Sequence, residues 1–196
     1  MDHREPSLNF YLAGRYSRRE ELCAYRDTLV ARGHSAPARW LLGEHQAHGV
    51  EAARAVESKG PVPAEQARLF ATDDVEDVLA ADVIVSFTEP PRASATRGGR
   101  HVELGIGLGL RRAGPPAHAP TLVIVGPLEN VFHALPDVDA AFDTWSDFLD
   151  AFDTLPSLHG IDERGESLCT EHPLHRMSNE HRSLRRSPFS SLATTR

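Results

Sequence analysis

The sequence predicts an α/β fold built on a parallel sheet. Short apolar runs such as "LNFYLAG" (8–14) and "DVIVSF" (82–87) are typical of buried parallel strands, because helices cover both faces of such a strand. Segments with helical spacing of apolar residues lie between these runs, and strands that alternate with helices form parallel sheets with right-handed crossovers. Ligand sites in such sheets lie at the carboxyl ends of the strands.

The first helix is predicted directly after the first strand, in "SRREELCAYRDTLVARGH". Ser17 and Glu20 have the spacing of a capping box, and Gly33 supplies the stop signal. The apolar positions that share one face are Leu22, Tyr25, Leu29 and Val30. Strand, turn and helix are therefore complete by Gly33.

The middle of the chain continues this alternation. "SAPARWLL" (35–42) is a candidate second strand, although its proline confines it to an edge or leaves only its last half paired. Residues 43–62 carry turn residues at both ends, which predicts an excursion over the sheet of the kind that serves as a substrate loop. A helix over 63–81 then precedes the strand at 82–87, with apolar spacing at Ala67, Ala71, Val75, Val78 and Leu79.

Further helices are predicted at 100–114 and 146–152, and further strands at 121–127 and 142–145. The predicted architecture is thus a three-layer Rossmann-like or flavodoxin-like sandwich with a mostly parallel five-stranded sheet. Length and composition fit one compact domain over residues 1–155. Beyond about Leu155 the sequence turns to Ser, Arg, His and Glu without periodicity, which predicts a disordered tail at 156–196.

Charge and composition exclude several classes of partner. The net charge is −7 at pH 7 and the isoelectric point is near 5.9, so the chain as a whole has no electrostatic attraction to nucleic acid or to anionic membrane. The N-terminus does not have the form of a signal peptide, and a cytoplasmic protein is expected. The ligand-type residues of "HQAH" (45–48) and "CTEHPLH" (169–175) lack a fourth partner at metal spacing, so no metal site is predicted. Small polar molecules are the expected partners.

The stretch "GGRHVELGIGLGL" (98–110) places one carboxylate, that of Glu103, in an otherwise glycine-rich and apolar helix start. The positive end of the helix dipole favours the ionised carboxylate by about 0.3–1 kcal/mol. An ionised carboxylate at the mouth of a sheet is able to attack as a nucleophile. Alternatively, Glu103 merely complements the dipole, as acids in first turns commonly do.

A nucleophilic carboxylate requires a second acid, because the leaving group must be protonated. In "ATDDVEDVLAAD", Asp74 shares a helix face with Ala71 and Val75, so it is expected to point toward the sheet. The acids of the same run that can remain solvated are Asp73, Glu76 and Asp77. Like charge and burial raise the pKa of a carboxyl group held near Glu103, which makes Asp74 the candidate general acid. The alternative is that the whole acidic run is a solvated helix face.

Three stretches carry a family resemblance: "FYLAG" in the first strand, "DDVEDVLAADVIVSF" in the middle and "GGRHVELG" at the third helix. Together they resemble the nucleoside 2-deoxyribosyltransferase superfamily, which includes the 2′-deoxynucleoside 5′-phosphate N-hydrolases, over about residues 8–146. In that family a glutamate of the E-L-G turn attacks the anomeric carbon of the sugar, and Glu103 is the matching position. An aspartate eight residues before the one that opens the strand handles the leaving base, which matches Asp74. The resemblance implies no cofactor.

The resemblance also implies a set of substrate contacts. The aromatic residue before the first Ala-Gly turn packs near the substrate, which matches Phe10, and Gly14 closes that turn. Asn130 in "GPLENVFH" matches an asparagine that enters the site of the neighbouring subunit, which implies a homo-oligomer. Trp40 and His45 in "RWLLGEHQAH" are candidates to stack on or hydrogen-bond a base, although Trp40 is equally suited to the core.

One position departs from the family pattern. Where the transferases carry an aspartate that hydrogen-bonds the sugar 5′-hydroxyl, this sequence has Arg97, which suits a 5′-phosphate through charge-assisted contacts. Gly98 and Gly99 would let backbone N–H groups approach the same phosphate. The arginines that would complete this cradle are Arg15, Arg18 and Arg100. The alternative for each of them is a solvated surface side chain.

Two classes of function follow. The first is an enzyme that breaks the N-glycosidic bond of a (2′-deoxy)nucleoside or its 5′-monophosphate through a glycosyl-Glu103 intermediate, and passes the sugar to a base or to water. The second is a nucleotide-binding sensor that keeps the fold without turnover. The presence of both Glu103 and Asp74 favours the enzyme, because a sensor needs no nucleophile together with an acid. The sequence leaves open the base, the sugar and the final acceptor.

Overall fold

A computed structural model describes residues 7–43, 64–90, 98–115 and 119–154. All of them belong to the first of the two units into which the chain divides, Met1–Leu155. The tail predicted at 156–196 and, apart from Gly43, the excursion predicted at 43–62 lie outside the described residues.

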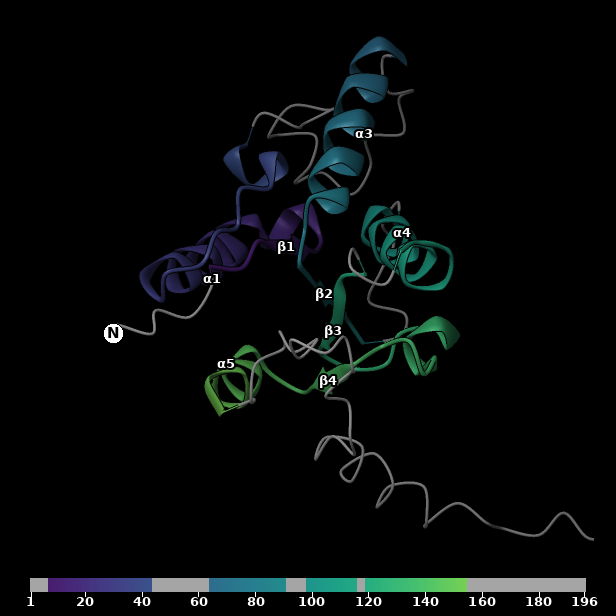
Figure 1. Cartoon of the computed structure of the whole chain (residues 1–196). Coiled ribbons are helices and arrows are strands. Elements are labelled where there is room, and N and C mark those ends of the chain that lie inside the picture. The colour runs from purple at the N-terminus through teal and green to yellow at the C-terminus, as the bar shows by residue number, and fades with distance from the viewer. Residues whose placement is uncertain (1–6, 44–63, 91–97, 116–118, 155–196) are drawn as a thin grey trace, which may run out of the picture. The chain divides into compact units, whose positions relative to one another are not determined.

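The described part of the chain is an α/β unit around a parallel sheet, as predicted. Its strands lie side by side in chain order (Figure 1) and are β1 (Phe10–Ala13), β2 (Val83–Phe87), β3 (Thr121–Val125) and β4 (Ala140–Phe142). The α-helices are α1 (Arg19–Ala31), α3 (Ala64–Leu79), α4 (Gly99–Ala113) and α5 (Trp145–Thr154). In these residues the sheet has four strands rather than the five predicted.

The segment predicted as a second strand, 35–42, is the main correction to the fold. Ser35 makes an isolated parallel bridge to Asn9, on the side of that residue opposite β2. Pro37 has no N–H with which to continue the ladder, and Arg39–Leu42 form the 3-10 turn η2. The bridge extends the sheet beyond one edge of β1 while β2 lies on its other edge. The chain therefore reverses its direction of strand addition at β1 and β2, which is where α/β sheets bind ligands.

The first helix starts later than the sequence predicts. A 3-10 turn, η1 (Tyr16–Arg18), precedes α1, so Ser17 lies within that turn and the N-cap position is Arg18 instead. Gly33 follows the helix end with φ 91°, a left-handed conformation that glycine adopts without strain. The predicted apolar face is buried at Leu22 and Leu29 and half-buried at Tyr25, whereas Val30 is exposed.

Two later elements also differ from their predicted limits. The last strand ends at Phe142, and Trp145, predicted as its final residue, opens α5 because its ring packs into the core. On α3, Val78 is buried as predicted and Ala67 is half-buried. The predicted core positions that are exposed instead are Ala71, Val75 and Leu79.

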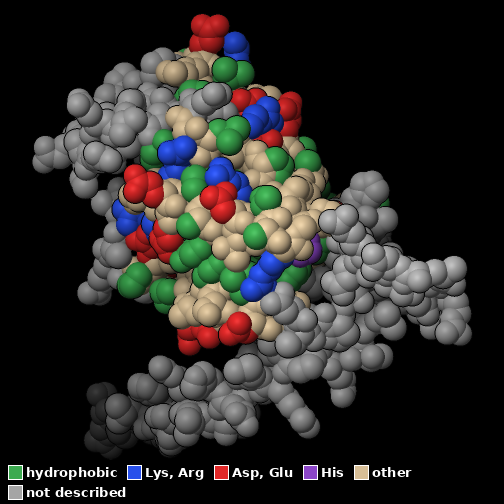
Figure 2. Space-filling view, turned by 90° about the vertical axis from the view of Figure 1, so that its left-hand side faces the viewer, with side chains coloured by type: hydrophobic (Ala, Val, Ile, Leu, Met, Phe, Trp, Pro, Cys, Tyr) green, Lys and Arg blue, Asp and Glu red, His purple; other side chains and the backbone are tan. Residues whose placement is uncertain are grey.

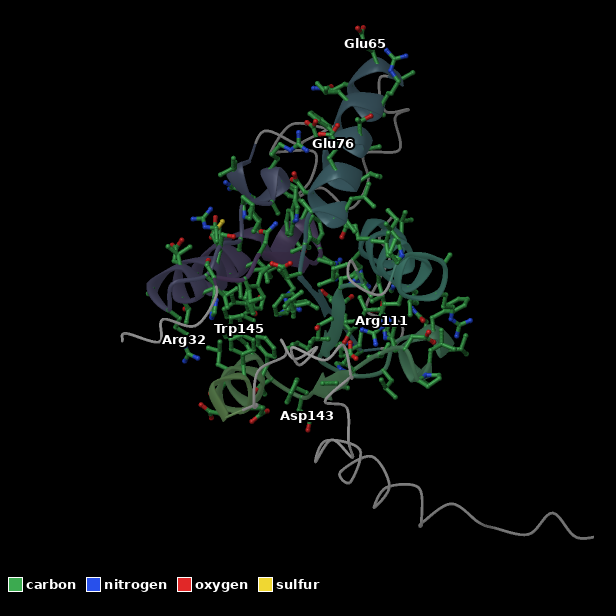
Figure 3. All side chains as sticks on the ribbon, viewed as in Figure 1. Arg32, Glu65, Glu76, Arg111, Asp143 and Trp145 are labelled. Atoms are coloured by element: carbon green, nitrogen blue, oxygen red, sulfur yellow. The ribbon has the colours of Figure 1, made fainter. Side chains whose placement is uncertain are left out.

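Different helices cover the two faces of the sheet, which gives the predicted three layers (Figure 1). On one face, Tyr25 of α1 stacks on Trp145 of α5 with ring centroids 4.6 Å apart. On the other face α4 packs so closely that a Cβ on Gly107 would lie 2.7 Å from Ile84 Cδ1. Figure 3 labels Trp145 on the first side and Arg111 on the side of α4.

The strand register decides which side chains face α4. Tyr11 is paired with Ile84, and Ala13 with Ser86. Because successive strand residues point to opposite faces, Tyr11 and Ser86 lie on the face that Ile84 presents to α4. Phe10 lies on the opposite face, where its ring packs against Phe152 of α5 with centroids 5.5 Å apart.

The surface carries charges of both signs. On the face that Figure 2 views, the Arg side chains of the described residues are interspersed with Asp and Glu rather than gathered into a basic patch. Along α1 the same mixing produces the ion pairs Arg18–Glu21 and Arg26–Asp27. No helix in the described ranges combines the length and apolar character needed to cross a membrane.

Candidate active site

Glu103 lies on α4 where this helix covers the carboxyl halves of the central strands. The helix begins at Gly99, and Gly98, with φ of 74°, is its N-cap residue. Glu103 therefore lies in the second turn, whereas the sequence predicted the first turn. Helical side chains lean toward the helix N-terminus. Accordingly, Oε1 of Glu103 lies 3.9 Å from the point where a Cβ on Gly99 would stand.

Burial, and not the helix dipole, decides the protonation of Glu103. Loss of hydration and then the negative charge of Asp74 raise the pKa of Glu103 to about 8, against the smaller opposing effects of the Tyr11 hydroxyl and the Arg100 guanidinium. The expectation of a dipole-stabilised anion is therefore corrected. The free protein holds this carboxyl group largely protonated at neutral pH.

Asp74 approaches this carboxyl group from α3, which packs against α4. It is half-buried, and its charge raises the pKa of both Glu103 and Tyr11. Ala71 and Val75, which were expected to share an inward face with Asp74, are exposed, so helical phase does not account for this placement. The structure nevertheless brings together the two carboxyl groups that the sequence singles out.

All three other acids of this run bind Arg39 of η2. Asp73 and Asp77 are half-buried rather than solvated, whereas Glu76 is exposed as expected. Arg39 Nη1 donates to Asp73 Oδ1 at 2.7 Å, its Nη2 to Glu76 Oε2 at 3.0 Å and its Nε to Asp77 Oδ1 at 2.9 Å. The backbone N–H of Arg39 also donates to Asp77 Oδ2 at 2.7 Å. These bonds fasten η2 to α3 and orient the helix that carries Asp74; Figure 3 labels Glu76 near η2.

Tyr11 is the site residue that the sequence analysis missed. It is fully buried, and burial together with the charges of Glu103 and Asp74 raises the pKa of its phenol, so the hydroxyl keeps its proton and is available as a donor. Strand alternation could have identified Tyr11, because adjacent strand residues face opposite helix layers and the sequence analysis considered only its neighbour Phe10. The substrate contact expected of Phe10 would have to form on the face opposite Glu103.

Three buried polar atoms on the α4 face have no hydrogen-bond partner among the described residues: Tyr11 Oη, Ser86 Oγ and Glu103 Oε2. The Tyr11 hydroxyl and the Glu103 carboxyl group lie close together but form no hydrogen bond of standard geometry within this part of the chain. An unsatisfied buried polar atom costs about 1–3 kcal/mol, and native proteins rarely leave one without a role. Three of them on one face indicate a place for a polar ligand.

The loops that follow the strands meet at the carboxyl edge of the sheet, as the sequence predicts. Arg15, after β1, forms an ion pair with Glu89, after β2. Arg100, in the first turn of α4, forms a buried ion pair with Glu129, after β3. The backbone N–H of Glu89 donates to Glu129 Oε2 at 3.3 Å, which joins the two pairs.

The arginines of the predicted phosphate cradle already bind carboxylates wherever they are described. Arg15 and Arg100 form the two pairs above, and Arg18 binds Glu21 on α1. Arg97 and His45 lie outside the described residues. A contact of these arginines with phosphate, and of Gly98 and Gly99 at the start of α4, stays a prediction.

Three further predicted substrate residues have clear structural positions. A Cβ on Gly14 would lie 2.6 Å from Leu22 Cδ2, so this glycine permits the close approach of β1 to α1. Trp40 is buried in η2, with Nε1 lacking a partner in the described residues. Asn130 is engaged within its own chain: Oδ1 accepts from Phe132 N at 2.9 Å, and Nδ2 lies 3.1 Å from His101 Nδ1 and 3.0 Å from His133 Nε2.

Comparison of the chain with protein-family models, curated proteins and solved structures finds no match. Within the described ranges, no group of three or more His, Cys, Asp or Glu side chains is arranged to hold a metal ion. A protonated carboxyl group beside a second carboxylate and a phenol is equipped to move a proton and to expose a nucleophile away from water.

Proposed function

We propose that the protein cleaves the N-glycosidic bond of a (2′-deoxy)nucleoside or its 5′-monophosphate, and passes the sugar to a base or to water. The observation that carries this proposal is that the buried carboxyl group of Glu103, on α4, interacts with the charge of the half-buried Asp74, on α3. The resemblance of "GGRHVELG" to the nucleoside 2-deoxyribosyltransferase superfamily supports the same pair.

The two carboxyl groups share one proton, and its position decides which group is the nucleophile and which is the acid. In the free protein the raised pKa keeps the proton on Glu103, next to the negative charge of Asp74. Transfer of this proton to Asp74 leaves the charge of the pair unchanged, and it produces an anionic nucleophile and an acid in a single step.

Two displacements complete the reaction. A carboxylate oxygen of Glu103 forms a bond to the anomeric carbon while the bond from that carbon to the base nitrogen breaks, and the proton of Asp74 goes to the departing nitrogen. Water or a second base, which gives its proton to Asp74, then attacks the same carbon and releases Glu103. Tyr11, which stays protonated, donates a hydrogen bond to the carboxylate or to the bound sugar.

The test is incubation of the purified protein with a panel of nucleosides, deoxynucleosides and their 5′-monophosphates, with and without a free base, followed by chromatography of the released base. Glu103→Gln and Asp74→Asn should each lower the rate of base release at least about a hundredfold. Glu65→Gln, which changes an exposed carboxylate in the first turn of α3, is the matched control. Near-normal release by Glu103→Gln, or no glycosyl adduct on the Glu103 peptide by mass spectrometry in the wild type, contradicts the covalent route.

Monophosphates are the expected substrates because Arg97 replaces the acid that would bind a free 5′-hydroxyl. A charged hydrogen bond contributes about 1.5–3 kcal/mol, so Arg97→Ala should lower kcat/KM for the monophosphate about ten- to a hundredfold and barely change that for the nucleoside. An equal fall in kcat/KM for both substrates would show that Arg97 does not bind the phosphate, and would favour nucleoside transfer.

We also propose that the active form is a homo-oligomer with sites completed across an interface. Apolar side chains next to Asn130 support this: Val131 is 80% exposed and Phe132 59%, both in the 3-10 turn η4 (Val131–Ala134). Sedimentation should give a particle larger than one chain, and Val131→Asp should shift it toward the monomer. A fully active monomer contradicts this proposal.

A nucleotide-binding sensor is the second candidate. It is favoured by the protonation of Glu103, because a protonated carboxyl group donates a hydrogen bond to a ligand rather than attacking it. Calorimetric binding of a nucleotide from the same panel without release of its base would decide for the sensor.

A further inference from the structure

The hydroxyl group of Ser86 has no part in the mechanism above. Ser86 lies in β2 and is fully buried, and its Oγ has no hydrogen-bond partner among the described residues. Its neighbours in the strand are apolar, so alanine at this position would avoid the cost of an unsatisfied buried hydroxyl group. The position is therefore suited to bind a polar group that the described residues do not supply.

A second buried hydroxyl group close by shows how a structural one is satisfied. Thr88 follows β2 and is also buried, and its Oγ1 donates to the carbonyl oxygen of Val125 at 3.3 Å. Ser86, two residues earlier, has no such bond within the described part of the chain. The difference separates a hydroxyl group that supports the fold from one that is directed elsewhere.

The register places Ser86 at the level of Glu103. Gly107 of α4 lies over Ile84, and the helix runs back from the carboxyl edge of the sheet. Four helical residues toward that edge, a rise of about 6.0 Å, lead from Gly107 to Glu103. Two strand residues in the same direction, about 6.6 Å, lead from Ile84 to Ser86. Tyr11 pairs with Ile84 on the neighbouring strand, so three unpartnered groups face one region.

We propose that Ser86 is a specificity-determining residue of this site and that it binds one hydroxyl group of the sugar beside Glu103. The inference rests on the proposed function, since that function brings a sugar to Glu103. A sugar hydroxyl group both donates and accepts, which matches a set made of the Ser86 hydroxyl, the Tyr11 donor and the Glu103 carboxylate. A sugar with this hydroxyl group would therefore bind with its anomeric carbon in a fixed position relative to Glu103.

Stability and kinetics of Ser86→Ala separate this role from a structural one. Because the variant loses an unsatisfied group, its Tm should equal or exceed that of the wild type, whereas Thr88→Val, which breaks an internal hydrogen bond, should lower Tm. The kcat/KM of Ser86→Ala should fall about three- to tenfold, as loss of one neutral hydrogen bond predicts. A lower Tm with unchanged kcat/KM would show that Ser86 serves the fold alone.

Sugar analogues identify the contact. Three substrate analogues are compared, which lack the 2′-, the 3′- or the 5′-hydroxyl group. For two of them, Ser86→Ala should lower kcat/KM as it does for the full substrate. For the third, which lacks the hydroxyl group that Ser86 binds, wild type and variant should have equal kcat/KM. An equal loss with every analogue overturns the inference.

Binding measurements keep the inference distinct from the proposed function. The Glu103→Gln variant cannot form the glycosyl ester, so it allows binding to be measured without reaction. Calorimetry should show that adding Ser86→Ala to Glu103→Gln weakens the binding of every analogue except the one that lacks the hydroxyl group bound by Ser86, for which the affinity should not change. This pattern supports the Ser86 contact even where the wild type releases no base, a result that refutes only the proposed reaction. Equal binding throughout, with base release intact in the wild type, refutes only the role of Ser86.

Discussion

Replacement of Glu103 by Gln should make stability less dependent on pH. The folded protein holds a proton on Glu103 up to about pH 8, whereas the unfolded chain loses it near the ordinary value of 4.5. The folded state thus binds more protons between these values, and stability falls as pH rises through this window. Each pH unit contributes about 1.4 kcal/mol, so the wild type should lose up to about 5 kcal/mol between pH 4.5 and pH 8 through this group.

The assay is urea unfolding of both proteins at several pH values. Gln preserves the shape of the protonated carboxyl group, so the two proteins should differ least at pH 4.5. The advantage of Glu103→Gln should then grow up to about pH 8 and level off above it. Glu65→Gln, at an exposed site on α3, controls for general charge effects. A difference between wild type and Glu103→Gln that stays constant from pH 4.5 to pH 8 would falsify the argument that burial keeps Glu103 protonated.

Three further perturbations test the packing around the site. Glu129→Gln removes the carboxylate that pairs with the buried Arg100 and should cost about 3 kcal/mol in urea unfolding; a loss below about 1 kcal/mol would show that this pair contributes little to stability. Gly107→Ala should destabilise by about 1–3 kcal/mol because its Cβ would contact Ile84 and Leu122, whereas Gly105→Ala, with no atom within 4 Å of its Cβ, should stabilise by about 0.5 kcal/mol. The same sign for both would contradict the α4 packing. Arg39→Ala should lower Tm more than Arg112→Ala, which breaks a pair with Asp137 alone; equal losses would mean that η2 is not fastened through Arg39.

The fold was predictable where local sequence decides it. The apolar runs at 8–14, 82–87 and 121–127 become strands because helices cover both of their faces, a condition that such runs signal directly. The segment 35–42 fails as a strand because its decisive contacts are distant. Arg39 turns toward carboxylates on α3, and no local pattern reports that attraction.

The sequence predicts which carboxyl groups interact at the candidate site but not their surroundings. Motif spacing singles out Asp74 and Glu103, and in the structure the charge of Asp74 raises the pKa of Glu103. Tyr11 and Ser86 were missed because a tyrosine and a serine in an apolar strand resemble core residues until the register assigns them a face. The protonation of Glu103 was misjudged because the helix dipole can be inferred from sequence, whereas the loss of hydration depends on what packs over the carboxyl group.

The features that make this site costly for the fold are those that suit it to chemistry. Tyr11 and Ser86 bury hydroxyl groups without partners in the described residues, and Glu103 must give up its proton in a region of low polarity before it can attack. Under the proposed function, a bound sugar would offset these costs, because its hydroxyl groups would supply the missing partners and its departing base would take up the proton. Each group would then be better satisfied in the reacting complex than in the free protein, which is the relation that differential binding of a transition state requires. Stability gained by Glu103→Gln or Ser86→Ala should therefore be accompanied by loss of activity.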